Sequence, residues 1–410
     1  MKKFLVIMLC VAVLAGMCVT FAACGGDGSA DIKVGVIWVG DATEGYTEAH
    51  IKGVETAVAN IEKQGKKVEV LTKELVKEDD SCAAAARDLV AEGCTLIFSN
   101  SYGHQDYMAQ VAGEYPDITF VSATGDYAAL TGLKNFKNAF TYCYEGRYVS
   151  GIVAGMKLKE LLDNGTVSKE KTPQSFEGDN VKVGYVGAYT YAEVISGYTA
   201  FLLGVQSIVP NTVMEVQFTD SWFDIDQEAN AAETLINNGC VIISQHSDTA
   251  GPAIACEESI ESHTVYHVGY NWSMTDVAPT TSLIGCRINW APYLISAVDA
   301  VFHHETIESH VDAACFGTDA SAGFDKNWVQ MLKLNDIIAA EHTQETIDEL
   351  IKGFSKNEIE VFQGDYIGVD PFDETDVYDL SDGYAENESQ SSPSFHYVLQ
   401  DVITVINEEE

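Results

Sequence analysis

Short runs of β-branched and apolar residues alternate along this chain with longer segments whose apolar residues recur at helical spacing. The short runs predict strands and the helical spacing predicts amphipathic helices. In the first half, the expected strands are residues 33–39, 67–71, 96–99 and 119–122, and the expected helices are residues 46–64, 81–93 and 106–114. Strands that alternate with helices predict a parallel sheet covered by helices on both faces.

The same β-α pattern begins again near residue 181. Ile-Lys-Val-Gly-Val-Ile at 32–37 is similar to Val-Lys-Val-Gly-Tyr-Val at 181–186. Further strands are expected at 213–218 and 241–244, and further helices at 193–207 and 227–238. Residues 168–180, which are poor in apolar side chains, are expected to form a surface loop before the repeat. The repeat predicts an α/β fold of two Rossmann-like lobes with a cleft between them.

The loops that follow the expected strands are candidates for a binding site, because ligands of open parallel sheets lie outside the carboxyl ends of the strands. These loops are residues 40–46, 100–104, 123–126, 187–191, 221–224, 246–248, 269–273 and 289–293. They are rich in Trp, Tyr, Asn, Asp and His, although such residues are common in any loop. The mixture suits a flat small molecule that stacks on aromatic rings and binds amides or carboxylates at its polar edge.

The N-terminus has the layout of a bacterial secretion signal. A basic start precedes an apolar run over residues 4–17, and small residues lead to Cys24. We expect residues 1–23 to be a signal peptide, Cys24 to be lipidated, and residues 24–30 to be a flexible tether. An ordinary cleaved signal with a coincidental cysteine is the alternative. No later apolar run approaches the roughly 20 residues that span a bilayer, so the expected location is the extracytoplasmic face of the cell membrane.

The net charge of −39 narrows the class of partner. Such a surface repels nucleic acid polymers and anionic lipids, and it disfavours polyanionic ligands. A small uncharged or zwitterionic ligand fits better. Apart from the signal and Cys24, the cysteines are odd in number and contain no C-x-x-C pair: Cys82, Cys94, Cys143, Cys240, Cys256, Cys286 and Cys315. We expect them to be mostly reduced, with one disulfide left open.

Motifs for catalysis, cofactors and metals are missing from the expected loops. G-x-S-x-G, Walker A and G-x-G-x-x-G do not occur, so we expect no cofactor and no enzymatic activity. His303 and His310 would lie two turns apart on a helix, about 10 Å, too far to share a zinc ion. The acidic residues 370–388 lack the spacing of a calcium loop and are expected to be solvated. We therefore predict no metal site, with a calcium site at 370–388 as the less favoured alternative.

Several motifs together resemble one known family. They are Tyr-Glu-Gly-Arg-Tyr at 144–148 with Gly151 and Ala154-Gly155, Ser-Trp-Phe-Asp at 221–224, Gln-His-Ser-Asp at 245–248, Val-Gly-Tyr-Asn at 268–271, and Asn-Trp-Ala-Pro-Tyr at 289–293. With this order the chain resembles the basic membrane protein family of substrate-binding lipoproteins, especially its purine-binding branch. The resemblance implies the fold of type I periplasmic binding proteins and delivery of a ligand to an ABC importer.

The resemblance also implies the boundaries of the lobes. Three crossovers would join them in the hinge. The N-terminal lobe would hold residues 31–142 and 290–305, and the C-terminal lobe would hold residues 143–289 and 306–410. Arg147, at the expected first crossover, would fix the hinge by pairing with an acidic residue, and ligand contact is its less favoured role.

Ligand contacts are expected from residues in or beside the strand-end loops. The candidates are Trp38, Asp41, Tyr46, Tyr102, Thr124, Trp222, Phe223, His246, Asp248, Asn271 and Trp290. For some of them a structural role remains open: Trp222 or Phe223 packing between helices, Trp290 packing at the hinge, and Asn271 forming a turn. Tyr46 and His104 depart from the residue types usual in the family.

The resulting functional hypothesis is a monomeric, lipid-anchored receptor that captures a purine nucleoside or nucleobase and passes it to an ABC permease. The alternatives are a ligand-sensing lipoprotein and a binding protein for a flavin or a sugar. A secreted nucleoside hydrolase that uses Asp224 or Asp248 is less favoured, because no nucleophile or metal motif accompanies these residues.

Overall fold

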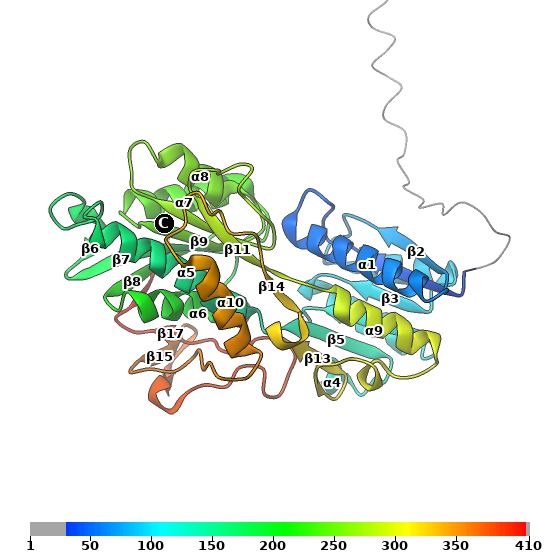
Figure 1. Cartoon of the computed structure of the whole chain (residues 1–410). Helices are drawn as coiled ribbons and strands as arrows, with labels where there is room; N and C mark the ends of the chain where they lie inside the picture. Colours follow the sequence, from blue (N-terminus) through cyan, green and yellow to red (C-terminus); the bar gives the residue numbers. More distant parts are fainter. Residues whose placement is uncertain (1–29, 407–410) are drawn as a thin grey trace, which may run out of the picture. The chain divides into compact units, whose positions relative to one another are not determined.

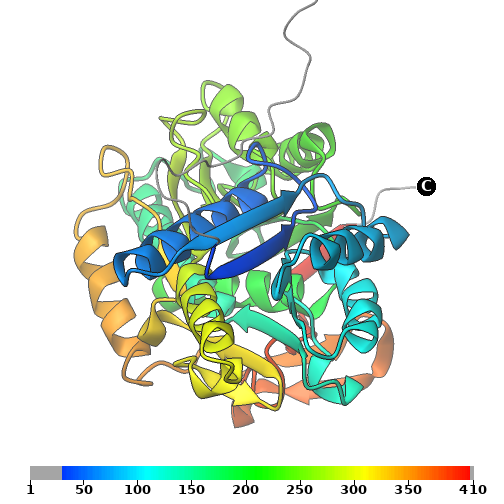
Figure 2. The same cartoon turned by 90° about the vertical axis from the view of Figure 1, so that its right-hand side faces the viewer.

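Two large β-sheets organise the chain in the computed structural model, which describes residues 30–406 (Figures 1 and 2). The expected signal peptide and the expected lipidation site at Cys24 lie outside the described residues. Residues from Asp31 onward form one unit, and within it each large sheet is mainly parallel and carries helices on both faces. The prediction of an α/β fold with two lobes is confirmed. Every strand and helix expected from the pattern is present, with ends displaced by no more than about two residues.

The first lobe is built on a seven-stranded sheet in the order β12-β13-β5-β4-β3-β1-β2, parallel except for β12. Its strands are β1 (Ile32–Ile37), β2 (Val68–Lys73), β3 (Leu96–Ser99), β4 (Thr119–Ala123), β5 (Phe136–Thr141), β12 (Ala314–Phe316) and β13 (Asp319–Ala322). Its helices are α1 (Gly45–Lys63), α2 (Asp80–Ala91), α3 (Gln105–Glu114), α4 (Ala128–Thr131) and α9 (Ala291–Phe302).

Neighbouring residues of the buried strands supply two separate apolar layers. Val34 and Val36 of β1 pack in the layer formed with α1 and α9, whereas Ile37 packs in the layer formed with α2 and α3. In β3, Leu96 belongs to the first layer and Ile97 to the second. Successive side chains of a strand point to opposite faces. A strand that is buried on both faces must therefore be apolar throughout, as the sequence pattern predicted.

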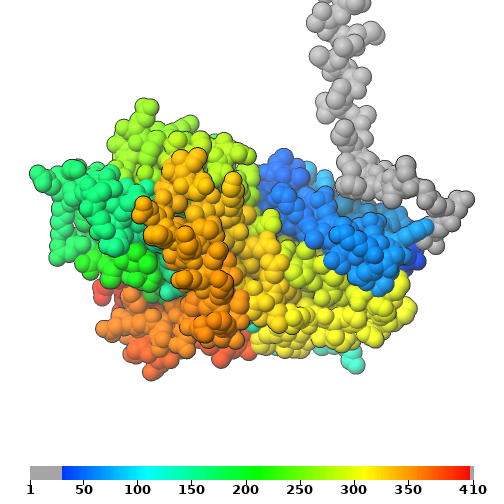
Figure 3. Space-filling model, in the orientation of Figure 1, coloured from blue at the N-terminus to red at the C-terminus, as the bar shows by residue number. Residues whose placement is uncertain are grey.

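The second lobe is built on an eight-stranded sheet in the order β14-β11-β10-β9-β7-β8-β18, with β6 paired to β7. Its strands are β6 (Phe176–Glu177), β7 (Asn180–Gly187), β8 (Thr212–Phe218), β9 (Ile242–His246), β10 (Tyr266–Tyr270), β11 (Ser282–Ile288), β14 (Val329–Met331) and β18 (Ile403–Ile406). Its helices are α5 (Cys143–Asp163), α6 (Ala192–Ile208), α7 (Ile225–Asn237), α8 (Gly251–Ser259) and α10 (Thr343–Phe354). Figure 3 shows α10, in orange, on the surface of this lobe.

Glycines allow α5 and α6 to pack unusually closely. A Cβ atom at Gly151 of α5 would lie 2.1 Å from the carbonyl oxygen of Phe201. A Cβ atom at Gly204 of α6 would lie 2.3 Å from the carbonyl oxygen of Tyr148. Both distances are shorter than any van der Waals contact, so only glycine fits at these positions. The motif after Arg147 therefore includes a helix-packing element.

The chain crosses between the lobes three times, as predicted: from β5 to α5, from β11 to α9 and from β13 to β14. The boundary expected at residue 306 is wrong, because β13 forms a parallel ladder with β5 of the first sheet. β12 then pairs antiparallel with β13 and covers the new sheet edge. Residues 314–322 thus extend the first sheet, which β5 would otherwise end with an open edge.

The acidic segment after residue 366 is structured, in contrast to the expected solvated loop. It forms a small sheet of β15 (Ile367–Asp370), β16 (Asp373–Asp379) and β17 (Val398–Leu399). Between β16 and β17 the chain reaches the first lobe, where Ser391 donates a hydrogen bond to the carbonyl oxygen of Gly125 at 3.4 Å. β18 then joins the second sheet beside β8. The expected loop at 168–180 likewise contains β6.

Two further observations concern the described residues as a set. All of their cysteines are free thiols, and only Cys315 is exposed. None of the described helices combines the length and apolar character needed to cross a membrane.

Candidate functional site

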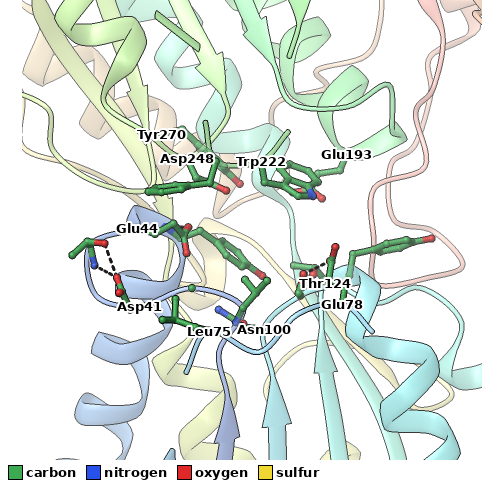
Figure 4. Close-up of a pocket in the computed structure, with 17 residues that line it drawn as sticks. Asp41, Glu44, Leu75, Glu78, Asn100, Thr124, Glu193, Trp222, Asp248 and Tyr270 are labelled. Carbon is green, nitrogen blue, oxygen red and sulfur yellow. Dashed lines mark hydrogen bonds between the residues drawn. The ribbon is translucent and has the colours of Figure 1, made fainter. Parts of the chain in front are cut away.

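A cavity of about 320 Å³ lies between the lobes, at the carboxyl ends of strands from both large sheets (Figure 4). Residues of the first lobe line one side: Val39, Gly40, Asp41, Thr43, Glu44, Tyr46, Leu75, Glu78, Asn100, Ser101, Tyr102 and Thr124. Residues of the second lobe line the other: Glu193, Trp222, Phe223, Asp248 and Tyr270. Both sets come from strand-end loops or from the first turns of helices, as the open-sheet rule predicts.

The first-lobe wall is fixed by the start of α1. The Glu44 carboxylate caps the helix by accepting hydrogen bonds from the backbone N–H groups of Tyr46 at 2.8 Å and Thr47 at 3.0 Å. Asn100 links this loop to the end of β3, because it accepts from Val39 N–H at 2.8 Å and donates to the Thr47 hydroxyl at 3.1 Å. These contacts hold the capping loop and the β3 loop at fixed positions around the cavity. Burial raises the pKa of Glu44.

Two lining residues have a backbone conformation that is rare for side chains other than glycine. The φ angle is +56° at Leu75 and +63° at Thr124. Left-handed conformation is particularly unfavourable for a β-branched residue such as threonine. Its hydroxyl donates to the carbonyl oxygen of Ala123 at 2.6 Å. Such backbone conformations concentrate at binding sites, where the surrounding structure maintains them.

The second-lobe wall is held by a short network around Asp248. Asn271, itself left-handed with φ +64°, donates its side-chain amide to Asp248 Oδ1 at 3.2 Å. Burial raises the pKa of Asp248 well above its ordinary value, and the nearby Glu44 and Glu228 carboxylates add to the shift. Asp248 therefore holds its proton more readily than a solvated aspartate, and a protonated carboxyl group can both donate and accept a hydrogen bond.

Glu228 supports the loop that carries Asp248. It accepts hydrogen bonds from the Ser247 hydroxyl at 2.7 Å and from the Thr249 backbone N–H at 3.2 Å. Burial raises the pKa of Glu228 to about 7. The loop after β9 is thus held at residues on both sides of Asp248, and the carboxyl group is presented to the cavity from a fixed backbone.

Arg147 lies behind this wall and is fully buried. Its guanidinium donates to the Tyr185 hydroxyl at 2.5 Å, the Ser244 hydroxyl at 2.9 Å and the Gln245 carbonyl oxygen at 2.7 Å. A longer contact reaches the Gly269 carbonyl oxygen at 3.3 Å. The expectation that Arg147 pairs with an acidic residue is wrong, because its hydrogen-bond partners among the described residues are hydroxyl and carbonyl groups of β7, β9 and β10 and the Cys286 sulfur of β11. Arg147 therefore supports the binding wall from behind.

Aromatic rings from both lobes meet at one side of the cavity. Tyr102 of the first lobe lies 5.9 Å, centroid to centroid, from Tyr191 of the second lobe. Tyr191 stacks on Tyr189 at 5.2 Å, and Tyr189 contacts Trp222 edge-on at 5.4 Å. This chain of rings is one place where the lobes approach each other beside the cavity. Planar faces from opposite walls are therefore available to a planar ligand.

The charged residues that line the cavity are all acidic. Asp41, Glu44, Glu78, Glu193 and Asp248 line it, and none of the described lining residues is a lysine, arginine or histidine. Such a lining disfavours phosphate and other anions, whereas it favours ligands with several hydrogen-bond donors. The buried Tyr270 hydroxyl has no hydrogen-bond partner among the described residues. Buried hydroxyl groups are normally paired, so a ligand or ordered water is expected at this atom.

Most of the predicted site residues lie on the cavity. Those that line it are Asp41, Tyr46, Tyr102, Thr124, Trp222, Phe223 and Asp248. Their contact with a ligand stays a prediction. Trp38, His246, Asn271 and Trp290 are not among the lining residues.

Each residue outside the lining has a structural role that explains its position. Trp290 is buried and stacks on His50 at 4.2 Å, which agrees with the packing alternative. Trp38 lies in the same apolar layer of the first lobe. His246 is buried behind the wall, with its Nε2 atom 3.3 Å from Glu193. Asn271 acts on Asp248 through the hydrogen bond described above.

Some lining residues were missed from the sequence. Glu193 lies just beyond the recognised loop 187–191, at the start of α6, and Tyr270 lies within the recognised loop 269–273, at the end of β10. Leu75 and Glu78 follow β2, a strand whose end was not considered. His104, which departs from the family pattern, does not line the cavity, because it is buried with Nε2 3.0 Å from the Val76 carbonyl oxygen.

The histidines at 303 and 310 do not share a helix, in contrast to the expectation. α9 ends at Phe302, and the two imidazole rings stack with centroids 6.0 Å apart. His310 Nδ1 lies 3.2 Å from the Asp299 carboxylate and its Nε2 contacts Glu305. Each ring nitrogen of His310 therefore already faces a carboxylate.

Comparisons with known proteins identify the fold and the class. Residues 32–362 match the profile of the Bmp family, described as ABC transporter substrate-binding protein PnrA-like. A purine-binding protein of Brucella abortus (strain 2308) is 32% identical over 272 residues, which cover 66% of this chain and 69% of that protein. The Haloferax volcanii protein TsgA13, provisionally named an ABC transporter glucose-binding protein, is 28% identical over 62% of this chain and 58% of its own length.

Solved structures agree at the level of the fold. An ABC transporter solute-binding protein from Conexibacter woesei DSM 14684 superposes with a TM-score of 0.60 at 16% identity, covering 80% of this chain and 97% of that chain. The fold is that of type I periplasmic binding proteins, as the resemblance implied.

Proposed function

Because the chain belongs to the Bmp family of PnrA-like ABC transporter substrate-binding proteins, we propose that it captures a purine nucleoside or nucleobase and delivers it to an ABC permease. The observation that carries the proposal is the cavity between the lobes, where aromatic rings from both sides surround a set of carboxyl groups. Its volume of about 320 Å³ falls at the lower end of the roughly 300–1,000 Å³ typical of small-molecule sites. The purine-binding relative supports the same ligand class.

The aromatic side chains suit a purine ring. Tyr46 and Tyr102 line the cavity from the first lobe, and Trp222 and Phe223 line it from the second. Base stacking on one aromatic side chain contributes about 1–3 kcal/mol. A ligand that contacts both lobes stabilises the closed form through its differential contacts, and lobe closure is the signal that a permease would recognise.

The acidic lining suits an uncharged purine rather than a nucleotide. Carboxylates accept hydrogen bonds from ribose hydroxyls and from the N–H groups of a base. A phosphate group would meet Asp41, Glu44 and Glu193 without a compensating cation among the described lining residues. We therefore expect adenosine or guanosine to bind and their monophosphates to be excluded.

Membrane attachment through Cys24 is part of the proposal. The signal-like N-terminus and the glycine-rich residues after Cys24 support a protein tethered on the extracytoplasmic face, and we propose that it acts as a monomer. Metabolic labelling with a fatty acid tests this point. Label and membrane association should be lost in Cys24→Ser, and labelled Cys24→Ser protein would contradict the assignment.

Calorimetry against a small panel tests the ligand. The panel contains purine nucleosides, purine bases, the corresponding monophosphates, glucose and riboflavin. We expect dissociation constants in the micromolar range or below for at least one nucleoside or base, with no heat from monophosphates. Binding of glucose or riboflavin without any purine would remove the purine assignment and leave only the receptor class.

Glucose has a specific place in the panel, because a relative is named for glucose binding and carboxylates with aromatic rings also suit sugar hydroxyls.

Incubation with nucleosides followed by chromatography tests the hydrolase alternative, which requires release of free base. Growth on the identified ligand, with and without the ABC permease of the same organism that imports it, separates transport from sensing.

A further inference from the structure

Outside the cleft, three potential metal ligands gather in the small C-terminal sheet. Asp370 ends β15, Asp376 lies in β16, and His396 lies just before β17. One ligand atom from each residue lies within 4.8 Å of the other two. His396 Nε2 is 3.7 Å from Asp370 Oδ2 and 3.8 Å from Asp376 Oδ2. The antiparallel pairing of β15 with β16 brings the two aspartates together, which no spacing along the sequence indicates.

The orientation of His396 is set by a partner outside this group. Its Nδ1 atom lies 2.8 Å from the carbonyl oxygen of Ser394. A carbonyl oxygen only accepts hydrogen bonds, so Nδ1 carries the ring proton and donates it. In the neutral ring, Nε2 then presents a lone pair toward the two carboxylates. The ring also stacks on Tyr397, with centroids 4.2 Å apart, so it has little freedom to turn away.

The two carboxylates are oriented in the same manner. Phe372 N–H donates to Asp370 Oδ1 at 2.7 Å, and the Tyr397 hydroxyl donates to Asp376 Oδ1 at 3.2 Å. In both cases the oxygen that faces His396 is the other one, Oδ2. Partners that hold the outer atom of each ligand and leave the inner atom free are typical of metal sites.

A cation between the inner atoms would stabilise them. Three electron-rich atoms face one another, and within the described part of the chain no lysine or arginine forms an ion pair with Asp370 or Asp376. Either a metal ion or a second proton on His396 would relieve the repulsion. The overall charge of −39 favours the capture of cations in general.

We propose that Asp370, Asp376 and His396 bind a divalent transition-metal ion such as Zn²⁺, with water completing the coordination. One imidazole nitrogen and two carboxylate oxygens are a donor set that suits zinc, whereas calcium prefers six to eight oxygens. Metal–ligand distances near 2.1 Å place tetrahedral donors about 3.4 Å apart. The two distances from His396, 3.7 and 3.8 Å, therefore need to contract by only a few tenths of an ångström, and the two carboxylates, which lie within 4.8 Å of each other, need to approach until they are also about 3.4 Å apart.

The position of the site suggests what the ion does. Asp370 and His396 also line a second cavity of about 300 Å³, which shares Tyr102, Thr124 and Glu193 with the cleft cavity. A metal ion would tie the segment before β17 to β15 and β16 and so fix one wall of this second cavity. The site lies beyond residue 362, where the family match ends, so it belongs to the C-terminal segment of this chain.

Zinc titration of the metal-free full-length protein tests the proposal. We expect one Zn²⁺ per chain by calorimetry and a higher melting temperature with Zn²⁺ than with Ca²⁺ or Mg²⁺. His396→Gln and Asp376→Asn should abolish the calorimetric signal. Tyr397→Phe keeps all three ligands and loses only the hydroxyl that orients Asp376, so its affinity should fall by about 10–100-fold. His310→Gln, which alters the other histidine cluster, is the matched control and should bind as the wild type does.

Two results would overturn the site. One is unchanged zinc affinity in folded His396→Gln. The other is the absence of zinc binding at neutral pH together with a melting temperature that rises on acidification only when His396 is present, which identifies a protonated imidazole in place of the metal. X-ray absorption of the zinc-loaded wild type is independent of the variants. It should show one imidazole nitrogen in a shell of oxygens, and an all-oxygen shell would reject the assignment.

Discussion

The backbone N–H of Asp248 donates a hydrogen bond to the carbonyl oxygen of Trp222 at 2.9 Å. This bond joins the loop after β8 to the loop after β9, so the indole and the carboxyl group occupy the same wall of the cavity. It uses only main-chain atoms. Removal of the Trp222 side chain should therefore leave the geometry of both loops intact, which makes this residue suitable for separating binding from folding.

Trp222→Ala should weaken binding of the purine that binds best by about 1–3 kcal/mol, the contribution of one base–aromatic stack. Trp222 is half-buried and lines the cavity, so the melting temperature of the empty protein should change little. Trp290→Ala is the matched control. That indole is buried away from the cavity, and its loss should destabilise the fold by about 3–5 kcal/mol. Unchanged affinity in Trp222→Ala would remove the stack from the proposed site.

The two tryptophans also show which features of the site could be predicted from the sequence. Both follow strands and both belong to family-like motifs, yet only Trp222 lines the cavity. Trp290 directly precedes α9, and its side chain packs against Gly53 of α1, where a Cβ atom would lie 2.8 Å from that of Trp290. This contact between segments more than 200 residues apart leaves no local signal in the sequence.

The main strands and helices could be predicted from the sequence, because their apolar patterns are local. The near-continuous apolar pattern of β1 or β3 follows from burial on both faces, which is a local property. The placement of β13 beside β5 is not, because a short Asp-Ala-Ser-Ala strand carries no strong pattern and is selected by the free edge of the sheet. The proximity of Asp370, Asp376 and His396 could not be predicted for the same reason, since strand pairing creates it.

The guanidinium of Arg147 should contribute to stability as well as to the shape of the site. It makes hydrogen bonds to groups in three strands, β7, β9 and β10, and lysine offers a compact ammonium that cannot reach them all. Arg147→Lys should therefore cost about 1.5–3 kcal/mol, the value of one or more lost charged hydrogen bonds. Urea unfolding measures this. Arg287→Lys, at a half-buried arginine whose side-chain hydrogen bonds within the described part of the chain go to Gln330, should cost less, and equal losses would contradict the assigned role.

Two Gly→Ala substitutions should change the stability of the protein in opposite directions, because only one of the glycines lies in a close contact between helices. Gly204→Ala in α6 should destabilise the protein by about 1–3 kcal/mol, because the new methyl group would overlap the Tyr148 carbonyl oxygen. Gly113→Ala in α3 meets no atom within 4 Å and should stabilise by about 0.5–1 kcal/mol through helix propensity. Thermal unfolding of both variants provides the measurement. Stabilisation by Gly204→Ala would show that α5 and α6 do not pack this closely.

Glu145 should make the stability of the protein depend on pH. Its carboxyl group is buried beside the start of the third crossover and accepts a hydrogen bond from Phe324 N–H at 2.7 Å. Burial raises the pKa of Glu145 from 4.5 to about 8. Between these two values the unfolded chain releases this proton while the folded protein retains it. The contribution of Glu145 to stability is therefore fully present below about pH 4.5 and decreases as the pH rises toward 8.

Glu145→Gln removes this dependence, because a neutral amide of the same shape has no proton to lose. The difference in unfolding free energy between variant and wild type should rise with pH by up to about 1.4 kcal/mol per pH unit across that window. Glu228 and Asp319, whose pKa values burial raises to about 7 and about 6, shift stability in the same direction. They cancel in the comparison because both proteins contain them. Glu177→Gln, at an exposed position, should give a flat difference. A flat difference for Glu145→Gln as well would mean that Glu145 is ionised in the folded protein and that the crossover holds a buried negative charge.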